Sequence, residues 1–295
     1  AICSAGEHHA VLDPVEHAGG ATVGLDDLGR VTPDALADVL RAHDDVSVVS
    51  VIAVNNETGA VNDLPALAAV VREHAPGALV HTDAVQAVSW LDLAAATADV
   101  DLVSITGHKL GGPIGTGALF VRQGLTLGAQ ILGGGQERGR RAGTPDVAGA
   151  AAFAAAVSVT VERRPAEIVR LGAMRDRLVA GLIDQLGDAV WPTVQRPGDT
   201  DAVAAGMAHV ILADIEAEAL LFLLDQRGLR ASAASSCSSG AQDPSHVLAA
   251  MGIEREVAQG SLRLSLGWTS TDADVDRALE IIPEAVRHLR AHGGG

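Results

Sequence analysis

The sequence predicts an α/β protein with a large domain built on a mostly parallel sheet and a smaller α+β domain after it. The first half alternates apolar, β-branched runs with stretches of helical periodicity, which is the pattern of strands joined by helices. The second half changes to a mixed order of strands and helices around a loop of small residues. We therefore expect the large domain to span residues 1–160 and the small domain to span residues 161–295.

Apolar runs mark the expected strands of the large domain. The run VSVVSVIAV at 46–54 is continuous and β-branched, which is typical of a strand buried on both faces. The segment LPALAAVVREHA at 64–75 has helical spacing and would connect this strand to the next. Further strands are expected at the start of 78–88, at 101–107 and at 115–122. Polar residues follow several of these runs, so they should gather at the carboxyl ends of the strands, where open α/β sheets bind ligands.

The remaining elements are expected after a glycine-rich loop at 131–146. A long Ala-rich helix should follow, and the pattern is helical again around residues 160–185, where it could bridge two lobes. The small domain is expected to contain strand 208–213, helix 215–228, loop 231–242, helix 244–252, strand 261–267 and a final helix from Asp272.

Composition narrows the classes of function. The chain has 295 residues and is 48% hydrophobic, which is enough for a substantial core. Its net charge of −16 argues against the nucleic-acid backbone as the main ligand. The two cysteines, Cys3 and Cys237, cannot form a disulfide framework, so we expect the reducing cytoplasm. No apolar run approaches the length of a membrane span, and we expect neither membrane binding nor a metal site.

Lys109 raises the question of function. The chain contains 21 basic residues, and Lys109 is its one lysine. Arginine serves most structural purposes of a surface cation, but it cannot lose its proton and attack a carbonyl group. A lysine can do so when burial or a nearby cation lowers its pKa. A lone lysine between a histidine and a run of glycines therefore suggests a Schiff base with an aldehyde, of which pyridoxal 5′-phosphate is the common example.

The sequence offers partners for that cofactor. Asp83 follows an expected strand and could hold a pyridine nitrogen protonated, and Gln86 could bond the phenolic oxygen. Thr106 and His108 flank the lysine and could donate to a phosphate. Each residue also has a purely structural interpretation. Asp83 could cap a helix, the residues around Lys109 could form a strand-ending turn, and the histidines at positions 8 and 9 could simply begin a helix. Only the combination with the lone lysine favours the cofactor.

Several stretches together resemble the cysteine desulfurases of the NifS/IscS type, within the class V aminotransferase family. They are, in chain order, GEHHAVL, VNNETG, HTDAVQ, SITGHKLGGPIGTGALFV, GGGQERGRRAGT, SSCSSG and SLRLSLGWTST. The resemblance covers nearly the whole chain. It implies the fold type I of the enzymes that depend on pyridoxal 5′-phosphate, and the conversion of L-cysteine to L-alanine with transfer of the sulfur.

The resemblance also implies a role for each matching residue around the cofactor ring. Lys109 would bind the cofactor aldehyde and later move the substrate α-proton. Asp83 would pair with the pyridinium nitrogen and Gln86 with the phenolic oxygen. His8 would stack on the ring and assist proton transfer.

Three threonine and histidine side chains are implied as phosphate ligands. Thr106 and His108 would bind the phosphate of the cofactor in the same subunit. Thr144 would reach the phosphate of the cofactor in the other subunit of a homodimer.

Substrate binding and sulfur transfer fall to other residues. Asn56 would lie near the ring edge and the substrate, although the adjacent Asn55 leaves a one-residue ambiguity. Arg263 would bind the substrate carboxylate with two hydrogen bonds. Cys237, in a long segment of small residues, would take the sulfur as a persulfide and pass it to an acceptor protein, either an iron–sulfur scaffold or a tRNA-thiolation protein. Cys3 is expected to be an ordinary core residue.

The sequence departs from the family pattern at its beginning. Family members carry a segment before the GEHHAVL motif with a Gly-Ala-Thr turn that binds the cofactor phosphate, whereas this chain begins almost at the motif. We therefore expect either a fragment or truncated gene product, or a chain whose missing part is supplied by another chain. On its own the chain is expected to bind the cofactor weakly and to be poorly soluble. Two alternatives to a desulfurase stay open: another enzyme of the family, such as a selenocysteine lyase or an aminotransferase-like relative, and a remnant without catalytic activity.

Overall fold

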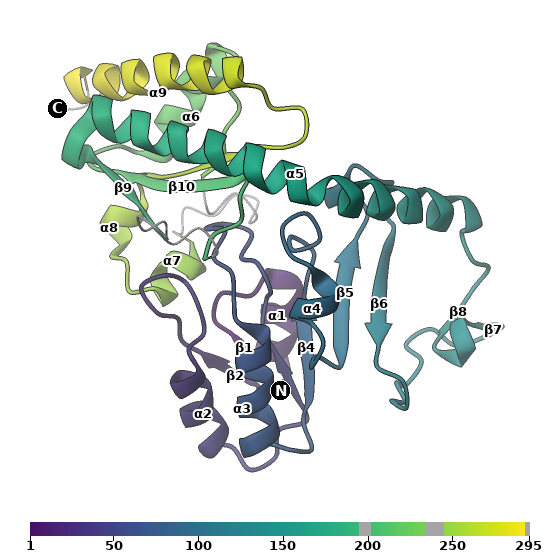
Figure 1. Cartoon of the computed structure of the whole chain (residues 1–295). Coiled ribbons are helices and arrows are strands. Elements are labelled where there is room, and N and C mark those ends of the chain that lie inside the picture. Colours follow the sequence, from purple (N-terminus) through teal and green to yellow (C-terminus); the bar gives the residue numbers. More distant parts are fainter. Residues whose placement is uncertain (195–201, 234–244, 293–295) are drawn as a thin grey trace.

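The computed structural model describes residues 1–194, 202–233 and 245–292 of the chain. It contains a large sheet and a small sheet, and the helix α5 (Val147–Leu186) runs past both (Figure 1). Within these residues no helix is both long and apolar enough to cross a membrane.

The large sheet has six strands in the order β2-β1-β3-β4-β5-β6. Every neighbouring pair is parallel except the last, because β6 runs antiparallel to β5. This arrangement confirms the predicted α/β fold with a mostly parallel sheet. The strands are β1 (Ile2–Ser4), β2 (Ala21–Val23), β3 (Val48–Ser50), β4 (Leu79–Asp83), β5 (Leu102–Thr106) and β6 (Gly117–Val121).

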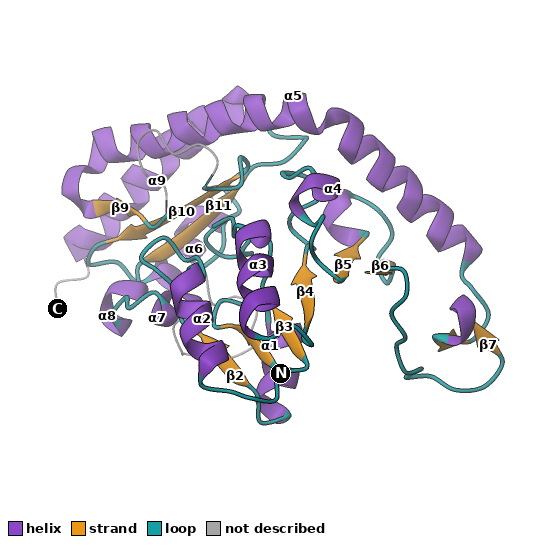
Figure 2. Ribbon diagram, turned by 60° about the horizontal axis from the view of Figure 1, so that its bottom comes forward, coloured by secondary structure: helices purple, strands orange, loops and turns teal. Residues whose placement is uncertain are grey.

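Helices cover both faces of this sheet, and the alternation of side chains along β1 shows how. Ile2 belongs to the main core under α2 (Pro33–Arg41) and α3 (Leu64–His74), which lie side by side (Figure 2). The next residue, Cys3, points to the opposite face and packs in a separate cluster with α1 (His9–His17). A short helix, α4 (Leu93–Ala96), precedes β5.

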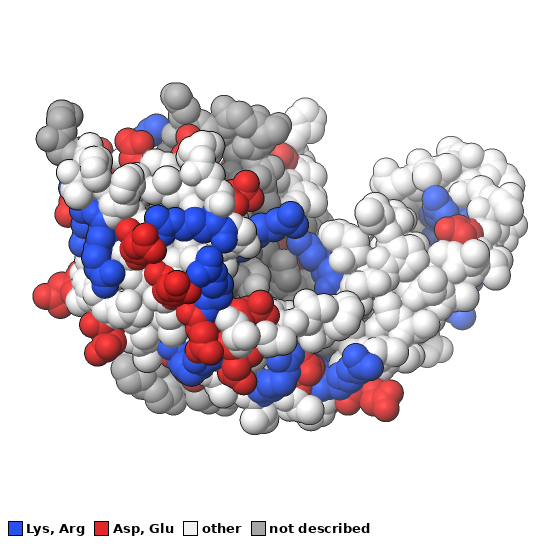
Figure 3. Space-filling view, turned by 90° about the horizontal axis from the view of Figure 1, so that it is seen from above, with Lys and Arg blue, Asp and Glu red and all other residues white. Residues whose placement is uncertain are grey.

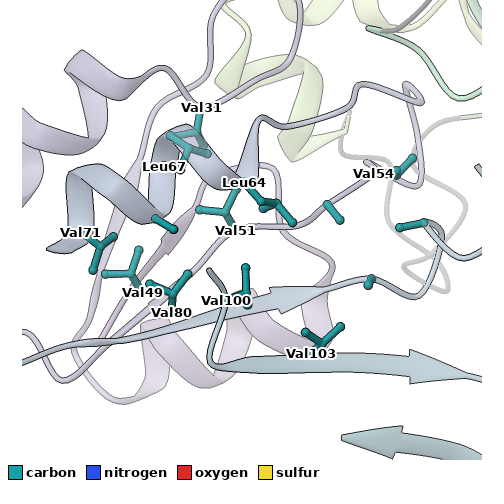
Figure 4. Close-up of a cluster of buried hydrophobic side chains, with 14 of the residues drawn as sticks. Val31, Val49, Val51, Val54, Leu64, Leu67, Val71, Val80, Val100 and Val103 are labelled. Carbon is teal, nitrogen blue, oxygen red and sulfur yellow. The ribbon is translucent and has the colours of Figure 1, made fainter. Parts of the chain in front are cut away.

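The main core joins valines of the strands to leucines of α3. Val49, Val80 and Val103 come from three neighbouring strands, and Leu67 and Val71 reach them from α3 (Figure 4). The β-branched residues fit a sheet buried on both faces, and the leucines recur at helical spacing. This packing holds the strands in register, and their carboxyl ends carry the polar residues of the candidate site.

The small lobe is an antiparallel sheet in the order β11-β10-β9, covered by helices. Its core combines residues of the second half of α5 with residues of the sheet and of the last long helix. The order of strands and helices agrees with the α+β pattern predicted for this part of the chain. The elements are β9 (Val190–Pro192), β10 (Met207–Leu212), α6 (Ala217–Gln226), α7 (His246–Ala250), α8 (Arg255–Ala258), β11 (Ser261–Ser265) and α9 (Asp272–His292).

The helix α5 is the connection that the helical pattern predicted. Phe153 in its first half belongs to the core of the large lobe, and Leu171 and Leu178 in its second half belong to the core of the small lobe. The predicted boundary between residues 160 and 161 therefore lies inside one continuous helix. The division of the chain at that point remains a proposal.

Two local expectations differ from the structure. The glycine-rich stretch 131–146 was expected to be a loop, but it contains a small hairpin, β7 (Gly135–Gln136) with β8 (Arg141–Ala142). The strand expected at 46–54 has ladder pairing only over β3. Its chain nevertheless continues along β4, because Val51 N donates to the His81 carbonyl and Ala53 N donates to the Asp83 carbonyl.

Candidate active site

A cavity of about 1240 Å³ lies at the carboxyl ends of the parallel strands, between the large sheet, α5 and β11. This is the edge at which open α/β sheets bind ligands. The structure brings most of the predicted site residues together in its wall. Those that line it are His8, Asn56, Asp83, Gln86, Thr106, His108, Lys109 and Arg263.

Lys109 sits on a single turn of 3₁₀ helix, His108–Leu110, directly after β5. The glycines on both sides make this tight turn feasible. A Cβ atom at Gly107 would lie 2.3 Å from Thr116 Oγ1, and Gly111 ends the turn in the left-handed conformation with φ of 73°. The turn therefore holds the lysine against the cavity on backbone that only glycine accommodates without strain.

Asp83 is the last residue of β4, and its side chain is buried. Its Oδ1 accepts a hydrogen bond of 2.8 Å from Val85 N, so the residue does stabilise the turn that follows the strand. The hydrogen bonds of this side chain within the described residues involve Oδ1 and not the other oxygen. A buried carboxylate with one oxygen left for a ligand fits a partner for a protonated pyridine nitrogen.

His8 has both of the roles that the sequence allowed. It caps α1, because its Nδ1 accepts a hydrogen bond of 3.1 Å from Ala10 N. Since Nδ1 is the acceptor, the neutral ring carries its proton on Nε2. The same ring lines the cavity, where it can stack on a planar cofactor.

Thr106 and His108 form a hydrogen-bonded pair beside the lysine. The Thr106 hydroxyl donates to the Thr116 carbonyl at 3.1 Å and accepts from His108 Nδ1 at 2.9 Å. The hydroxyl hydrogen of Thr106 therefore has an acceptor within the protein and is not available to a phosphate in this arrangement. In this arrangement a proton on His108 Nε2 would make the imidazole ring the charged donor for a phosphate.

The structure separates the two adjacent asparagines. Asn55 is buried, and its Oδ1 accepts from Glu57 N, Thr58 N and Thr58 Oγ1, each at 2.9 to 3.1 Å. Its Nδ2 donates to the Gly6 carbonyl at 2.9 Å, so both ends of its amide group hold this turn. Asn56 lines the cavity instead. The placement therefore favours Asn56 as the residue that faces the substrate.

Arg263 reaches the cavity from the middle of β11. Its Nη1 donates to the Asn56 carbonyl at 2.8 Å, which orients the guanidinium group and links the small sheet to the large lobe. Among the described residues, no other hydrogen bond of this guanidinium group competes with a carboxylate bound from the cavity side. Gln86, three residues after Asp83, lines the same cavity.

Two predicted residues are not part of this cavity wall. Thr144 is exposed, lies between β8 and α5, and is not among the lining residues. Its predicted role concerns a second subunit and stays a prediction. Cys237 lies outside the described residues.

The amine, the free carboxylate oxygen, the ring and the guanidinium group that meet in this cavity fit pyridoxal 5′-phosphate and an amino-acid substrate. Lys109 would hold the aldehyde carbon, Asp83 the ring nitrogen and His8 the face of the ring. His108 and Thr106 would lie beside the phosphate.

Comparison with known proteins agrees with this geometry. A family profile described as aminotransferase class-V matches residues 1–278. The chain belongs to the class-V aminotransferase family. It is 43% identical over 290 residues to a curated "IscS-like cysteine desulfurase" from Mycobacterium tuberculosis, with 96% of this chain and 72% of the relative covered. It is 41% identical to a "Cysteine desulfurase" from Gluconacetobacter diazotrophicus, with 98% of this chain and 72% of the relative covered.

Solved structures lead to the same family. A "NifS-like protein" superimposes with a TM-score of 0.87 at 30% identity, covering 98% of this chain and 75% of that one. The DndA protein from Streptomyces lividans superimposes with a TM-score of 0.71 at 32% identity, covering 90% and 74%. The predicted fold type and family are thus confirmed, and pyridoxal 5′-phosphate is the cofactor of these enzymes.

The sequence interpretation missed a buried acid, Glu7, which directly precedes His8. Its side chain is fully buried, and Oε1 accepts from Ser50 Oγ at 3.2 Å, whereas Oε2 has no hydrogen-bond partner in the described parts of the chain. Burial raises the pKa of Glu7 to about 8, and the negative charge of Asp83 adds to the rise, while hydrogen bonds from Ser50 and Ile52 oppose it. Glu7 is therefore mostly a neutral acid at pH 7. The only available signal was its position beside the histidine pair.

A hydrogen-bonded row extends from Glu7 across the sheet below Asp83. Ser50 Oγ lies 2.8 Å from His81 Nδ1, and His81 Nε2 lies 2.9 Å from Ser104 Oγ. Burial lowers the pKa of His81, which keeps this ring neutral. Asp83 consequently has uncharged polar neighbours on this side.

A second buried acid, Glu57, follows Asn56 in the same turn. Its Oε2 accepts a short hydrogen bond from Ser245 Oγ. Burial raises the pKa of Glu57 to about 7, and the Ser245 hydrogen bond and the charge of Arg263 oppose the rise. Its partner lies 188 residues away in the sequence, so no local pattern could have predicted the contact.

The raised pKa of Glu7 predicts a specific pH dependence of stability. Glu7 binds its proton more tightly in the native state than in the unfolded state. Its contribution to the unfolding free energy is therefore fully present below pH 4.5 and is lost as the pH rises through about 8. One such group changes the unfolding free energy by up to about 1.4 kcal/mol per pH unit. The Glu7→Gln variant, which is neutral at every pH, should show a smaller loss of stability between pH 5 and pH 8 in urea unfolding. If the unfolding free energies of the variant and the original chain changed with pH in the same way, the interpretation of Glu7 as a buried neutral acid would be contradicted.

Proposed function

We propose that this protein is a cysteine desulfurase that uses pyridoxal 5′-phosphate to convert L-cysteine to L-alanine and collects the sulfur on Cys237. The observation that supports it best is the meeting of Lys109, Asp83 and Arg263 in one cavity. An amine, a carboxylate and a guanidinium group are the three charges that this cofactor and an amino-acid substrate require. The curated relatives named cysteine desulfurases give the reaction its substrate.

Each residue of the cavity is proposed to have a separate role toward the substrate or the cofactor. Arg263 would bind the carboxylate through the N–H groups that Asn56 leaves free. Lys109 Nζ would then remove the α-proton and later return a proton to the product. The bound cofactor supplies an electron sink for the pair left on the α-carbon. Asp83 would hold the ring nitrogen protonated, and His8 would keep the ring flat in the cavity.

The sulfur step would belong to Cys237. Its thiolate attacks the substrate sulfur, so an S–S bond forms while the bond between the substrate Cβ and sulfur breaks. The electron pair of the broken bond stays with the substrate carbon skeleton, which takes up a proton and leaves as alanine. The product on the protein is a persulfide, whose outer sulfur passes to an acceptor protein. Iron–sulfur scaffolds and tRNA-thiolation proteins are the two acceptors proposed here.

Cys3 is not suited to this step. It is completely buried, and burial raises the pKa of its thiol to about 12, with the charges of Glu7 and Glu16 adding to the rise. A thiol that stays protonated is a poor nucleophile. A free, buried thiol also fits the reducing cytoplasm, which we propose as the location.

We further propose a homodimer, supported by an uncharged surface around the first half of α5. Residues 147–161 contain no charged side chain, and Figure 3 shows few charges along this part of the molecule. Apolar side chains nearby are strongly exposed: Ile114 is 91%, Leu132 84% and Val147 74% exposed. Exposed apolar patches of this kind mark protein interfaces. A partner subunit here would also lie beside Thr144.

Replacing Cys237 tests the sulfur step. The Cys237→Ser variant should bind the cofactor with the visible band of the original protein but should form alanine from L-cysteine at least about 100-fold more slowly, because the attacking thiolate is absent. Cys3→Ala is the matched control and should retain the rate. The measurement is alanine formation together with mass spectrometry of the persulfide. An unchanged rate in Cys237→Ser would exclude the proposed role and favour a lyase that needs no thiol.

Charged substitutions test the interface. The paired change Leu132→Asp with Val147→Asp should shift the molar mass measured by light scattering from a dimer to a monomer of 30.0 kDa, because two buried carboxylates cost several kcal/mol. Phe222→Asp is the matched control, since Phe222 is 64% exposed on α6 of the small lobe. A dimer that survives the paired change, or one that dissociates with Phe222→Asp, would place the interface elsewhere.

A further inference from the structure

Glu57 is a buried acid that does not line the cavity but touches the residues that do. It sits between Asn56, which lines the cavity, and Thr58, whose backbone and side chain are held by Asn55. Only 3% of its surface is exposed. Packing alone does not require a carboxyl group at such a position, because an apolar residue avoids the cost of burying it.

The partner of Glu57 is Ser245, the first residue described after the segment that contains Cys237. Ser245 Oγ donates to Glu57 Oε2 and accepts from Val247 N at 3.1 Å and Leu248 N at 3.2 Å, so it also caps α7. One hydroxyl group therefore fixes the start of α7 to the turn that carries Asn56.

His246 adds a second contact from the same place. Its Nε2–H donates to the carbonyl of Glu7 at 2.9 Å, and its ring lies 4.7 Å from the ring of His9. Burial lowers the pKa of His246, so the ring donates as a neutral group. The two residues after the Cys237 segment thus contact the two loops that carry His8 and Asn56.

A described residue shortly before the Cys237 segment also has a fixed partner. Ser232 pairs with Arg263 as an isolated bridge, with hydrogen bonds of 3.2 and 2.7 Å between their backbones. Arg263 in turn donates to the Asn56 carbonyl. Ser232, before the Cys237 segment, is thus bonded to Arg263, and Ser245, after it, is bonded to the neighbour of Asn56.

We propose that Glu57 is a positioning residue: through Ser245 it holds the start of α7 against the turn that carries Asn56. This inference rests on the proposed function, because Ser245 follows Cys237 by eight residues in the sequence and the Cys237 thiolate is proposed to attack the substrate sulfur. Misplacing a reacting group by about 1 Å can reduce a rate up to about 100-fold. Loss of the contact should therefore slow sulfur transfer without weakening the binding of cofactor or substrate.

The test compares two disruptive and two conservative variants of the full chain. Glu57→Ala and Ser245→Ala remove the hydrogen bond, whereas Glu57→Gln keeps an oxygen acceptor and Ser245→Thr keeps the hydroxyl group. The first readout is alanine formation from L-cysteine. The second is the conversion of β-chloro-L-alanine, which uses the same cavity but loses chloride without a thiol acceptor. The third is hydrogen exchange of the Val247 and Leu248 amides, measured without substrate.

The expected result is a selective loss. Glu57→Ala and Ser245→Ala should each lower alanine formation from L-cysteine about tenfold or more, and the double variant should lower it no further. Conversion of β-chloro-L-alanine should stay within about twofold, amide exchange in α7 should become faster, and both conservative variants should restore the original values. An equal loss with both substrates, an additive double variant, or a Glu57→Gln variant as slow as Glu57→Ala would overturn the proposal.

The exchange readout separates this proposal from the proposed function. If Cys237→Ser keeps the full rate, the function is wrong, but α7 exchange can still be compared between the original chain and Glu57→Ala. Unchanged exchange in Glu57→Ala would overturn the positioning role whatever the reaction is.

Discussion

The parallel pairing of β4 with β5 is the constraint on which the site depends. Asp83 ends β4 and pairs in register with Ser104 of β5, and the turn after β5 carries Lys109. Because the two strands run in the same direction, the acid and the amine leave the sheet at the same edge. The valine-rich core below them holds this register, so packing remote from the cavity determines where the two groups stand.

Burial limits the number of negative charges next to the cavity. Glu7 and Glu57 lie just behind cavity residues, and burial raises the pKa of both, so each is readily neutral near pH 7. The wall keeps two other acids, Asp83 at the end of β4 and Glu167 on α5, and a neutral Glu57 does not compete with a substrate carboxylate for Arg263. The polar row through Ser50 and His81 serves the same end, since it satisfies hydrogen bonds without adding charge.

Local patterns predicted the parts of the site that depend on strand ends. Asp83 and Lys109 each follow an apolar run, so their place at the edge of the sheet was readable from the sequence. The role of Glu57 was not, because its contact with Ser245 joins two lobes that only tertiary packing brings together. The strands β1 and β2 have three residues each, which is too short to show a period. The strands of the hairpin at 135–142 have two residues each and lie in a glycine-rich stretch.

The most direct measurement locates the cofactor on the chain. The protein loaded with pyridoxal 5′-phosphate is reduced with borohydride, digested and analysed by peptide mass spectrometry. The account predicts a reduced cofactor bound to Lys109, which is the one lysine of the chain. A label found solely on the amino terminus, or no label in a protein that shows the visible band, would contradict the assignment of this amine and of the cavity around it.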